Sequence, residues 1–161
     1  MSANHVRNSF TFSVAAAFEH TVPLFGAHAE RVWARDDWNP QFLYPVPAKD
    51  VPGAVFTLDR EGRQSIWINT AFDLQAGHVA YVSVVTGEVI TSIDILVRPV
   101  DTGHSHVEVV YERTALSPGA VHHVHQLGKH DALAGPEWEE SIAKALPGWL
   151  KARQLANRRQ P

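Results

Sequence analysis

The chain has 161 residues, of which 45% are hydrophobic, and it carries a formal net charge of -3. This size suits one domain that buries its own core, and the charge provides no basic surface for nucleic acid. The chain contains no cysteine, which excludes disulfides and thiolate metal sites. We expect a single domain over residues 1–161, with its core at about residues 9–150 and a tail at residues 151–161.

The first part of the chain predicts one strand followed by two short helices. Phe10, Phe12 and Val14 alternate with polar residues, which is the pattern of a half-buried strand. Residues 15–25 are rich in alanine and predict a short helix that Gly26 ends. Residues 27–34 then predict a second short helix.

Residues 35–53 contain four prolines, a density that argues against regular structure. The aromatic residues between them, among them Trp38, need a place to be buried. We therefore expect an ordered loop that packs on the domain.

The middle of the chain predicts an antiparallel meander. Valine, isoleucine, threonine and tyrosine dominate it, as is usual for strands, and turn residues separate its segments. The predicted strands are residues 54–58, 64–72, 78–86, 88–100 and 104–114.

The last part of the chain predicts two helices. Val121, Val124 and Leu127 have helical spacing, and Gly135-Pro136 separates them from a second apolar stripe that begins at Trp138. Pro147-Gly148 is expected to kink or end this second helix. The tail at residues 151–161 is then expected to fray in solvent.

Four segments resemble the START/SRPBCC helix-grip superfamily, which includes polyketide cyclases and pollen-allergen-like proteins. They are FTFSVAAAFEHTVPLFG, VAYVSVVTGEVITSIDILVRPV, HVEVVYERTALSPG and EWEESIAKAL. The resemblance implies an α+β fold in which a curved antiparallel sheet of six to seven strands wraps around a C-terminal helix. It also implies two short helices after the first strand and a cavity between sheet and helix.

Alternation within the strands predicts which residues face that cavity. Val89, Ile93 and Ile95 share one side of their strand, so Thr91 also points inward. In the next strand Val107 and Val109 set the phase, which places Tyr111 and Arg113 inside and His104, His106 and Glu108 outside. The candidate ligand-binding residues are Trp38, Trp67, Asn69, Tyr81, Ser83, Thr91, Tyr111 and Arg113. The alternative is that the aromatic residues are core side chains whose polar tips reach the backbone.

The ten histidines are the only candidates for a metal site. His104 and His106 share one side of a strand, and His122 and His125 are three residues apart in a helical pattern. Both pairs fall on predicted polar faces. We therefore expect no metal and no cofactor.

The resemblance implies a protein that holds a small hydrophobic or amphipathic molecule in a cavity on the order of several hundred cubic ångströms. One alternative is a cyclase-, aromatase- or hydratase-like enzyme that uses Tyr111, Arg113 or a histidine. Another is an interaction module whose cavity is filled by Trp67, Trp138 and Trp149. With no apolar stretch near the ~20 residues of a membrane span and no signal peptide, we expect a cytoplasmic monomer or weak homodimer.

Overall fold

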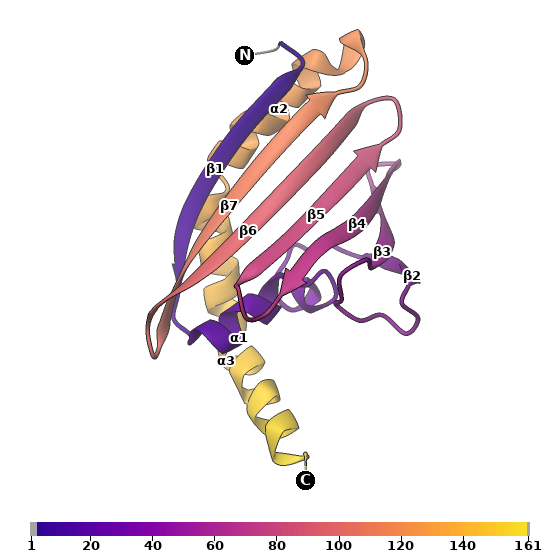
Figure 1. The fold of residues 1–161 in the computed structure, drawn as a ribbon. Helices are drawn as coiled ribbons and strands as arrows, with labels where there is room; N and C mark the ends of the chain where they lie inside the picture. Colours follow the sequence, from indigo (N-terminus) through magenta and orange to yellow (C-terminus); the bar gives the residue numbers. More distant parts are fainter. Residues whose placement is uncertain (1–2, 161) are drawn as a thin grey trace.

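The computed structural model describes residues 3–160 and consists of one seven-stranded antiparallel sheet with helices on one side (Figure 1). The strands follow the order β1-β7-β6-β5-β4-β3-β2 across the sheet. Two helices, α2 and α3, cover one face, and short helical turns follow β1. The predicted α+β helix-grip fold is therefore confirmed.

The strands match the predicted meander closely. Their bounds are β1 His5–Val14, β2 Gln41–Tyr44, β3 Val55–Arg60, β4 Arg63–Asp73, β5 His78–Val85, β6 Val89–Asp101 and β7 His104–Ala115. The expectation of a wholly irregular loop at residues 35–53 is wrong at β2, which pairs with β3. Pro40 and Pro45 flank β2 and leave the strand itself free of proline, and as an edge strand β2 needs only one set of ladder hydrogen bonds.

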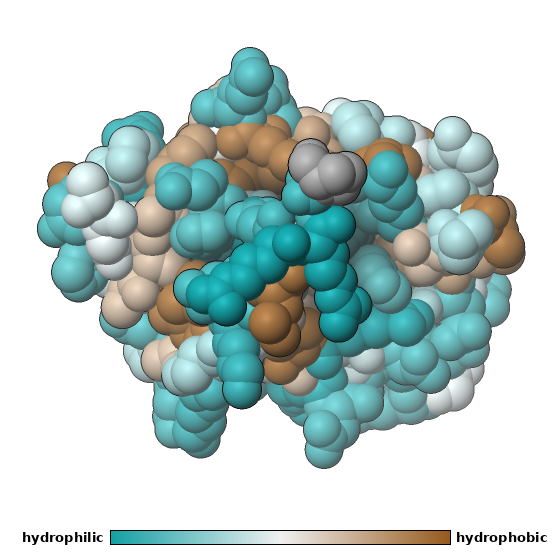
Figure 2. Space-filling model, turned by 90° about the horizontal axis from the view of Figure 1, so that it is seen from below, coloured by the Kyte–Doolittle hydropathy of each residue, from teal (hydrophilic) through white to brown (hydrophobic). Residues whose placement is uncertain are grey.

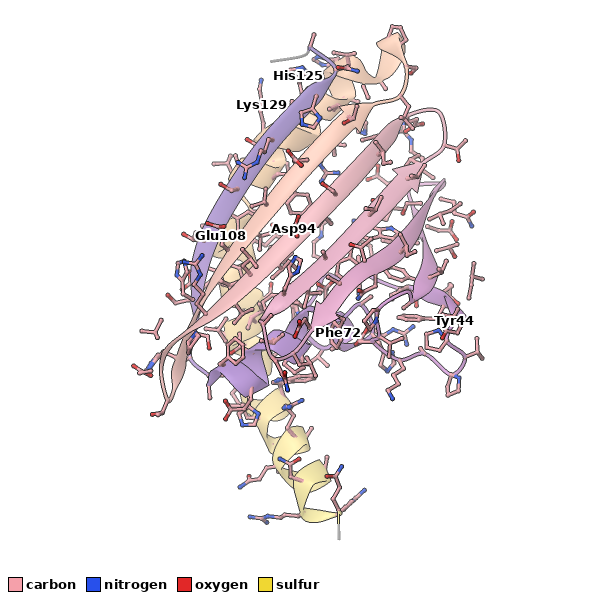
Figure 3. The ribbon with its side chains drawn as sticks, viewed as in Figure 1. Tyr44, Phe72, Asp94, Glu108, His125 and Lys129 are labelled. Atoms are coloured by element: carbon pink, nitrogen blue, oxygen red, sulfur yellow. The ribbon has the colours of Figure 1, made fainter. Side chains whose placement is uncertain are left out.

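Burial along β6 and β7 follows the predicted phase. Thr91, Ile93 and Ile95 are buried on the helix side, and Val107 and Val109 are fully buried beside them. Asp94, labelled in Figure 3, is exposed on the open face of the sheet. The assignment of inner and outer faces is confirmed.

Helix α2 spans Val121–Ala132 and packs on β1 and β7, and α3 spans Gly135–Arg158 and packs on β1. The predicted break at Gly135-Pro136 is confirmed, since Pro136 lies in the first turn of α3. Pro147-Gly148, expected to kink or end the helix, does not end it, because α3 continues for eleven residues beyond Pro147, to Arg158. Pro147 faces solvent, where water can satisfy the carbonyl group that loses its partner.

The tail at residues 151–161 is correspondingly not frayed over its described length. Residues 151–158 are helical and almost all exposed, and they carry α3 beyond the sheet (Figure 1). Trp149 fixes the last part of α3 through its indole N–H, which donates to the carbonyl of His20 at 2.9 Å. The guanidinium of Arg153 also donates to the His20 ring, at 3.0 Å. This anchoring to α1, Phe18–Thr21, offsets the missing backbone hydrogen bond at Pro147.

The short helices after β1 form one wall of the interior. Helix α1 runs directly into the 3-10 turn η1, Val22–Phe25, and a second 3-10 turn, η2, spans Ala29–Val32. The Asp50 carboxylate accepts hydrogen bonds from the backbone N–H groups of His28 and Ala29, at 2.8 and 3.0 Å. A Cβ atom at Gly26 would overlap the Asp50 side chain. Glycine at this position therefore lets Asp50 hold the start of η2.

No helix in residues 3–160 is long and apolar enough to cross a membrane. The end of the molecule from which α3 projects is mostly hydrophilic, with apolar areas beside the projecting helix (Figure 2).

Candidate functional site

A cavity of about 190 Å³ lies between the sheet, η2 and the junction of α2 with α3. It is smaller than the expected several hundred cubic ångströms, which favours a small ligand. Four of the five tryptophans line it, namely Trp33, Trp38, Trp67 and Trp138. Trp67 and Trp138 therefore line the cavity and do not fill it, and Trp149 lies outside it, against His20.

The structure brings seven of the eight candidate residues together around this cavity. They are Trp38, Trp67, Tyr81, Ser83, Thr91, Tyr111 and Arg113. Asn69 does not line the cavity. Its side chain is buried opposite Tyr81 in the sheet, and its side-chain amide oxygen, Oδ1, has no hydrogen-bond partner among the described residues.

The polar tips of several lining aromatic residues are engaged by the protein itself. The Tyr81 hydroxyl donates to the carbonyl of Phe25 at 2.6 Å, and the Trp38 indole N–H donates to the carbonyl of Ala27 at 2.9 Å. Trp67 donates to the hydroxyl of Ser65 at 2.8 Å. These residues present ring faces and edges to the cavity but no free donors.

Arg113 is held by an acid that the sequence analysis did not identify. Its Nε and Nη2 atoms donate to the two carboxylate oxygens of Asp131, at 2.6 and 2.8 Å, and Nη1 donates to the Thr91 hydroxyl at 3.2 Å. The guanidinium carbon also lies 5.0 Å from the ring centre of Tyr111. Bidentate pairing of this kind is strong and directional. The charge of Arg113 is therefore neutralised within the wall.

Glu30, on η2, is a second buried acid, and its environment is the opposite. Its side chain lines the cavity, the residue is 7% exposed, and its carboxylate forms no hydrogen bond or ion pair within residues 3–160. Burial raises the pKa of Glu30 well above its usual value, and repulsion from Asp50 raises it further, while Arg60 lowers it.

Other lining groups also lack a hydrogen-bond partner in the described part of the chain. Among them are the hydroxyls of Ser83 and Tyr111 and the indole N–H of Trp138. Burial raises the pKa of Tyr111, although Arg113 opposes this shift. The Tyr111 hydroxyl therefore stays protonated and can donate a hydrogen bond, but it is a poor base.

The sequence carried signals for both buried acids. Asp131 follows Val124 and Gly128 at helical spacing, and these three are the buried residues of α2. An acid in the last turn of a helix is also unfavourable unless a cation compensates it. Glu30 follows Ala27 by three residues and precedes Trp33 by three, and both of those neighbours are buried.

The histidines of residues 3–160 belong to no group of three or more potential metal-ligating side chains. His104 is paired with Asp101 at 2.9 Å on the surface, and His125, labelled in Figure 3, contacts the carbonyl of Ala3 at 2.7 Å. His130 is exposed at the edge of the cavity.

A second hollow of about 400 Å³ lies on the surface between the end of β1 and α3. It is lined mainly by small and aliphatic residues, among them Val14, Ile142 and Leu146. Its single ionisable side chain is the exposed Glu139. It therefore offers few groups that could orient a ligand.

Solved structures with this fold are similar to the chain. Norcoclaurine synthase from Thalictrum flavum, in complex with dopamine and hydroxybenzaldehyde, matches with a TM-score of 0.61 at 15% identity, over 89% of this chain and 87% of that chain. Ara h 8.0201 matches with a TM-score of 0.60 at 14% identity, over 92% and 99%. A hypothetical protein from Helicobacter pylori matches with a TM-score of 0.65 at 12% identity, over 86% of each chain.

No protein-family model and no curated protein matches the sequence. At such low identities the structural likeness shows the helix-grip fold alone.

Proposed function

We propose that this domain binds a small hydrophobic or amphipathic molecule in the cavity between the sheet and the helices. The observation that carries the proposal is the concentration of four tryptophans around a space of about 190 Å³ in an otherwise packed interior. Protein interiors normally leave few voids larger than a water molecule. A cavity with aromatic walls and a few free polar groups is the usual form of a ligand site.

The lining residues divide into two groups in this proposal. Trp38, Trp67 and Tyr81 have engaged polar tips, so they contribute ring surface and most of the binding free energy. The hydroxyls of Ser83 and Tyr111 form no hydrogen bond within residues 3–160, so they orient the ligand.

The remaining candidates have more limited parts in binding. Arg113 and Thr91 contribute shape, since Asp131 already engages the guanidinium and the Thr91 hydroxyl bonds to it. Asn69 lies outside the cavity wall, so we propose no ligand contact for it.

The fold supports this proposal only by analogy. Norcoclaurine synthase holds dopamine and hydroxybenzaldehyde, two small aromatic molecules, on the same architecture. That neighbour is also an enzyme, so an enzymatic activity of the cyclase, aromatase or hydratase kind is the second candidate. The free hydroxyl of Tyr111 is the observation that favours it, as a hydrogen-bond donor to a reacting group. A cytoplasmic location and a monomeric or weakly dimeric state stay predictions.

Thermal unfolding in the presence of small aromatic compounds tests the binding function. A ligand at about 100 times its Kd raises the Tm by roughly 5 °C or more. The substitution Ser83→Phe, which fills the cavity from β5, is expected to abolish this shift. Ser92→Phe, on the opposite face of the sheet, is the matched control and is expected to retain it. An equal ligand response in both variants would place binding elsewhere.

A further inference from the structure

Glu30 is fixed in position at the cavity wall. Its backbone N–H donates to the carbonyl of Gly26 at 2.8 Å, and its own carbonyl accepts from Ala34 at 2.7 Å. Asp50 holds the start of the same 3-10 turn. The carboxylate therefore cannot reach solvent by a simple change of backbone conformation, and it is retained in the cavity without a protein partner.

Every arginine that lines the cavity already has an acidic partner. Arg113 pairs with Asp131, and Arg35 and Arg60 both lie within 4 Å of the Asp37 carboxylate, at 3.8 and 3.4 Å. His130 and Glu137 are exposed at the edge. Glu30 is thus the buried charge-bearing group of the lining that has no ion pair within residues 3–160.

The aromatic lining favours a cation beside this acid. The face of an indole or phenol ring carries negative potential and attracts ammonium and guanidinium groups. One such contact already exists at the edge of the cavity, where the Arg60 guanidinium carbon lies 5.6 Å from the ring centre of Trp38. An anionic ligand would meet both the ring faces and the Glu30 carboxylate unfavourably.

We infer that the ligand is a small aromatic amine whose ammonium group pairs with Glu30 while its ring packs among the tryptophans. This inference rests on the binding function proposed above and narrows it to one chemical class. The volume of about 190 Å³ favours an amine with a single ring.

Binding of such an amine is coupled to proton release. In the empty cavity, burial and the charge of Asp50 favour the neutral form of the Glu30 side chain, and Arg60 opposes them. The other titratable groups that interact with the Glu30 carboxyl are Tyr81 and Tyr111. An ammonium ion favours the ionised carboxylate, so Glu30 loses its proton on binding. Amine affinity therefore rises with pH above the usual carboxyl range until the pKa of Glu30 in the empty cavity is passed, provided that the amine remains protonated.

Calorimetric titration with phenethylamine and with its neutral counterpart 2-phenylethanol tests the inference. At pH 7 the amine is expected to bind about tenfold or more tightly than the alcohol. Titration in two buffers of different ionisation enthalpy is expected to reveal proton release for the amine alone. Glu30→Gln is expected to remove both the preference and the proton release while it retains binding of the alcohol. Glu140→Gln, an exposed acid of α3 that pairs with Lys144, is the matched control and is expected to change neither.

The outcomes separate the two proposals. Equal binding of amine and alcohol, or an amine preference that survives Glu30→Gln, overturns the amine inference and leaves the binding function intact. Failure of both compounds to bind the unmodified protein overturns both the inference and the proposed function for ligands of this size.

Discussion

Two parts of the cavity wall each contain a buried acid, and only one of these acids has hydrogen-bond and ion-pair partners among the described residues. On α2, Asp131 is 3% exposed, and both of its carboxylate oxygens accept hydrogen bonds from Arg113. On η2, Glu30 is 7% exposed, and its carboxylate has no hydrogen bond or ion pair in the described chain. The comparison teaches that burial alone does not mark a functional group. An acid with a complete set of partners can be buried without an unmatched charge, whereas one without partners destabilises the fold and is free to meet a ligand.

The largest change in stability is expected from breaking the ion pair between Asp131 and Arg113. Asp131→Ala leaves Arg113 buried without a counter-charge and is expected to lower the free energy of unfolding by about 3 to 5 kcal/mol. Urea denaturation measures this change. The double variant Asp131→Leu/Arg113→Met removes both charges and is expected to recover most of the loss. A loss below about 1 kcal/mol in the single variant would show that the pair contributes little.

Substitution of the unpartnered acid, Glu30, is expected to change the free energy of unfolding in the opposite direction. Glu30→Gln removes the buried charge and is expected to raise the free energy of unfolding by about 1 to 3 kcal/mol at high pH. Because the pKa of Glu30 is raised in the folded state, the native protein binds this proton more tightly than the unfolded chain does. The unmodified protein therefore loses stability as the pH rises above the usual carboxyl value of 4.5, until the folded-state pKa is passed.

Urea denaturation of both proteins at a series of pH values measures this difference. The gain from Glu30→Gln is expected to be small at pH 4 and to grow toward pH 8. A gain that does not change with pH would mean that Glu30 titrates normally.

The two cavity tyrosines provide a smaller contrast. Tyr81→Phe removes the hydrogen bond to the carbonyl of Phe25 in a buried environment and is expected to cost about 1 to 2 kcal/mol of unfolding free energy. Thermal or urea denaturation measures it. Stability equal to that of the unmodified protein would indicate that another donor satisfies the Phe25 carbonyl.

Tyr111→Phe is expected to have the smallest effect on the fold. Its hydroxyl forms no hydrogen bond in residues 3–160, and the ring under Arg113 is kept, so the change is expected to stay within about 0.5 kcal/mol. Ligand binding, measured on the same variant, is expected to weaken if the hydroxyl orients the ligand. A marked loss of stability without ligand would instead assign Tyr111 to the structural group.

Arg113→Ala is a poor test of catalysis because it also breaks the buried ion pair with Asp131. The substitution leaves Asp131 buried without its partner, so lost activity would reflect lost structure. Tyr111→Phe probes the cavity without this complication.

The parts of the fold that depend on short-range pattern could be predicted from the sequence. Period-two alternation identified the inner faces of β6 and β7, because one side of each strand is buried. Gly135-Pro136 marked the break between α2 and α3 through local backbone chemistry.

The errors arose where distant partners decide the outcome. Helix α3 passes through Pro147 because Trp149 is anchored to His20, which is 129 positions away in the chain. Strand β2 forms between prolines because β3 supplies backbone hydrogen-bond partners for it. Arg113 is engaged by Asp131 from the following helix, a pairing that alternation within β7 cannot reveal.

The crowding of indoles around the cavity also has an optical consequence. The rings of Trp33 and Trp138 lie 5.2 Å apart at 57°, and those of Trp38 and Trp67 lie 5.6 Å apart at 87°. Chromophores this close and this oblique couple their electronic transitions, and packing fixes their geometry. The chain therefore carries an intrinsic reporter, since a molecule that enters between these rings alters the near-ultraviolet circular dichroism and the emission of the native protein without any added label.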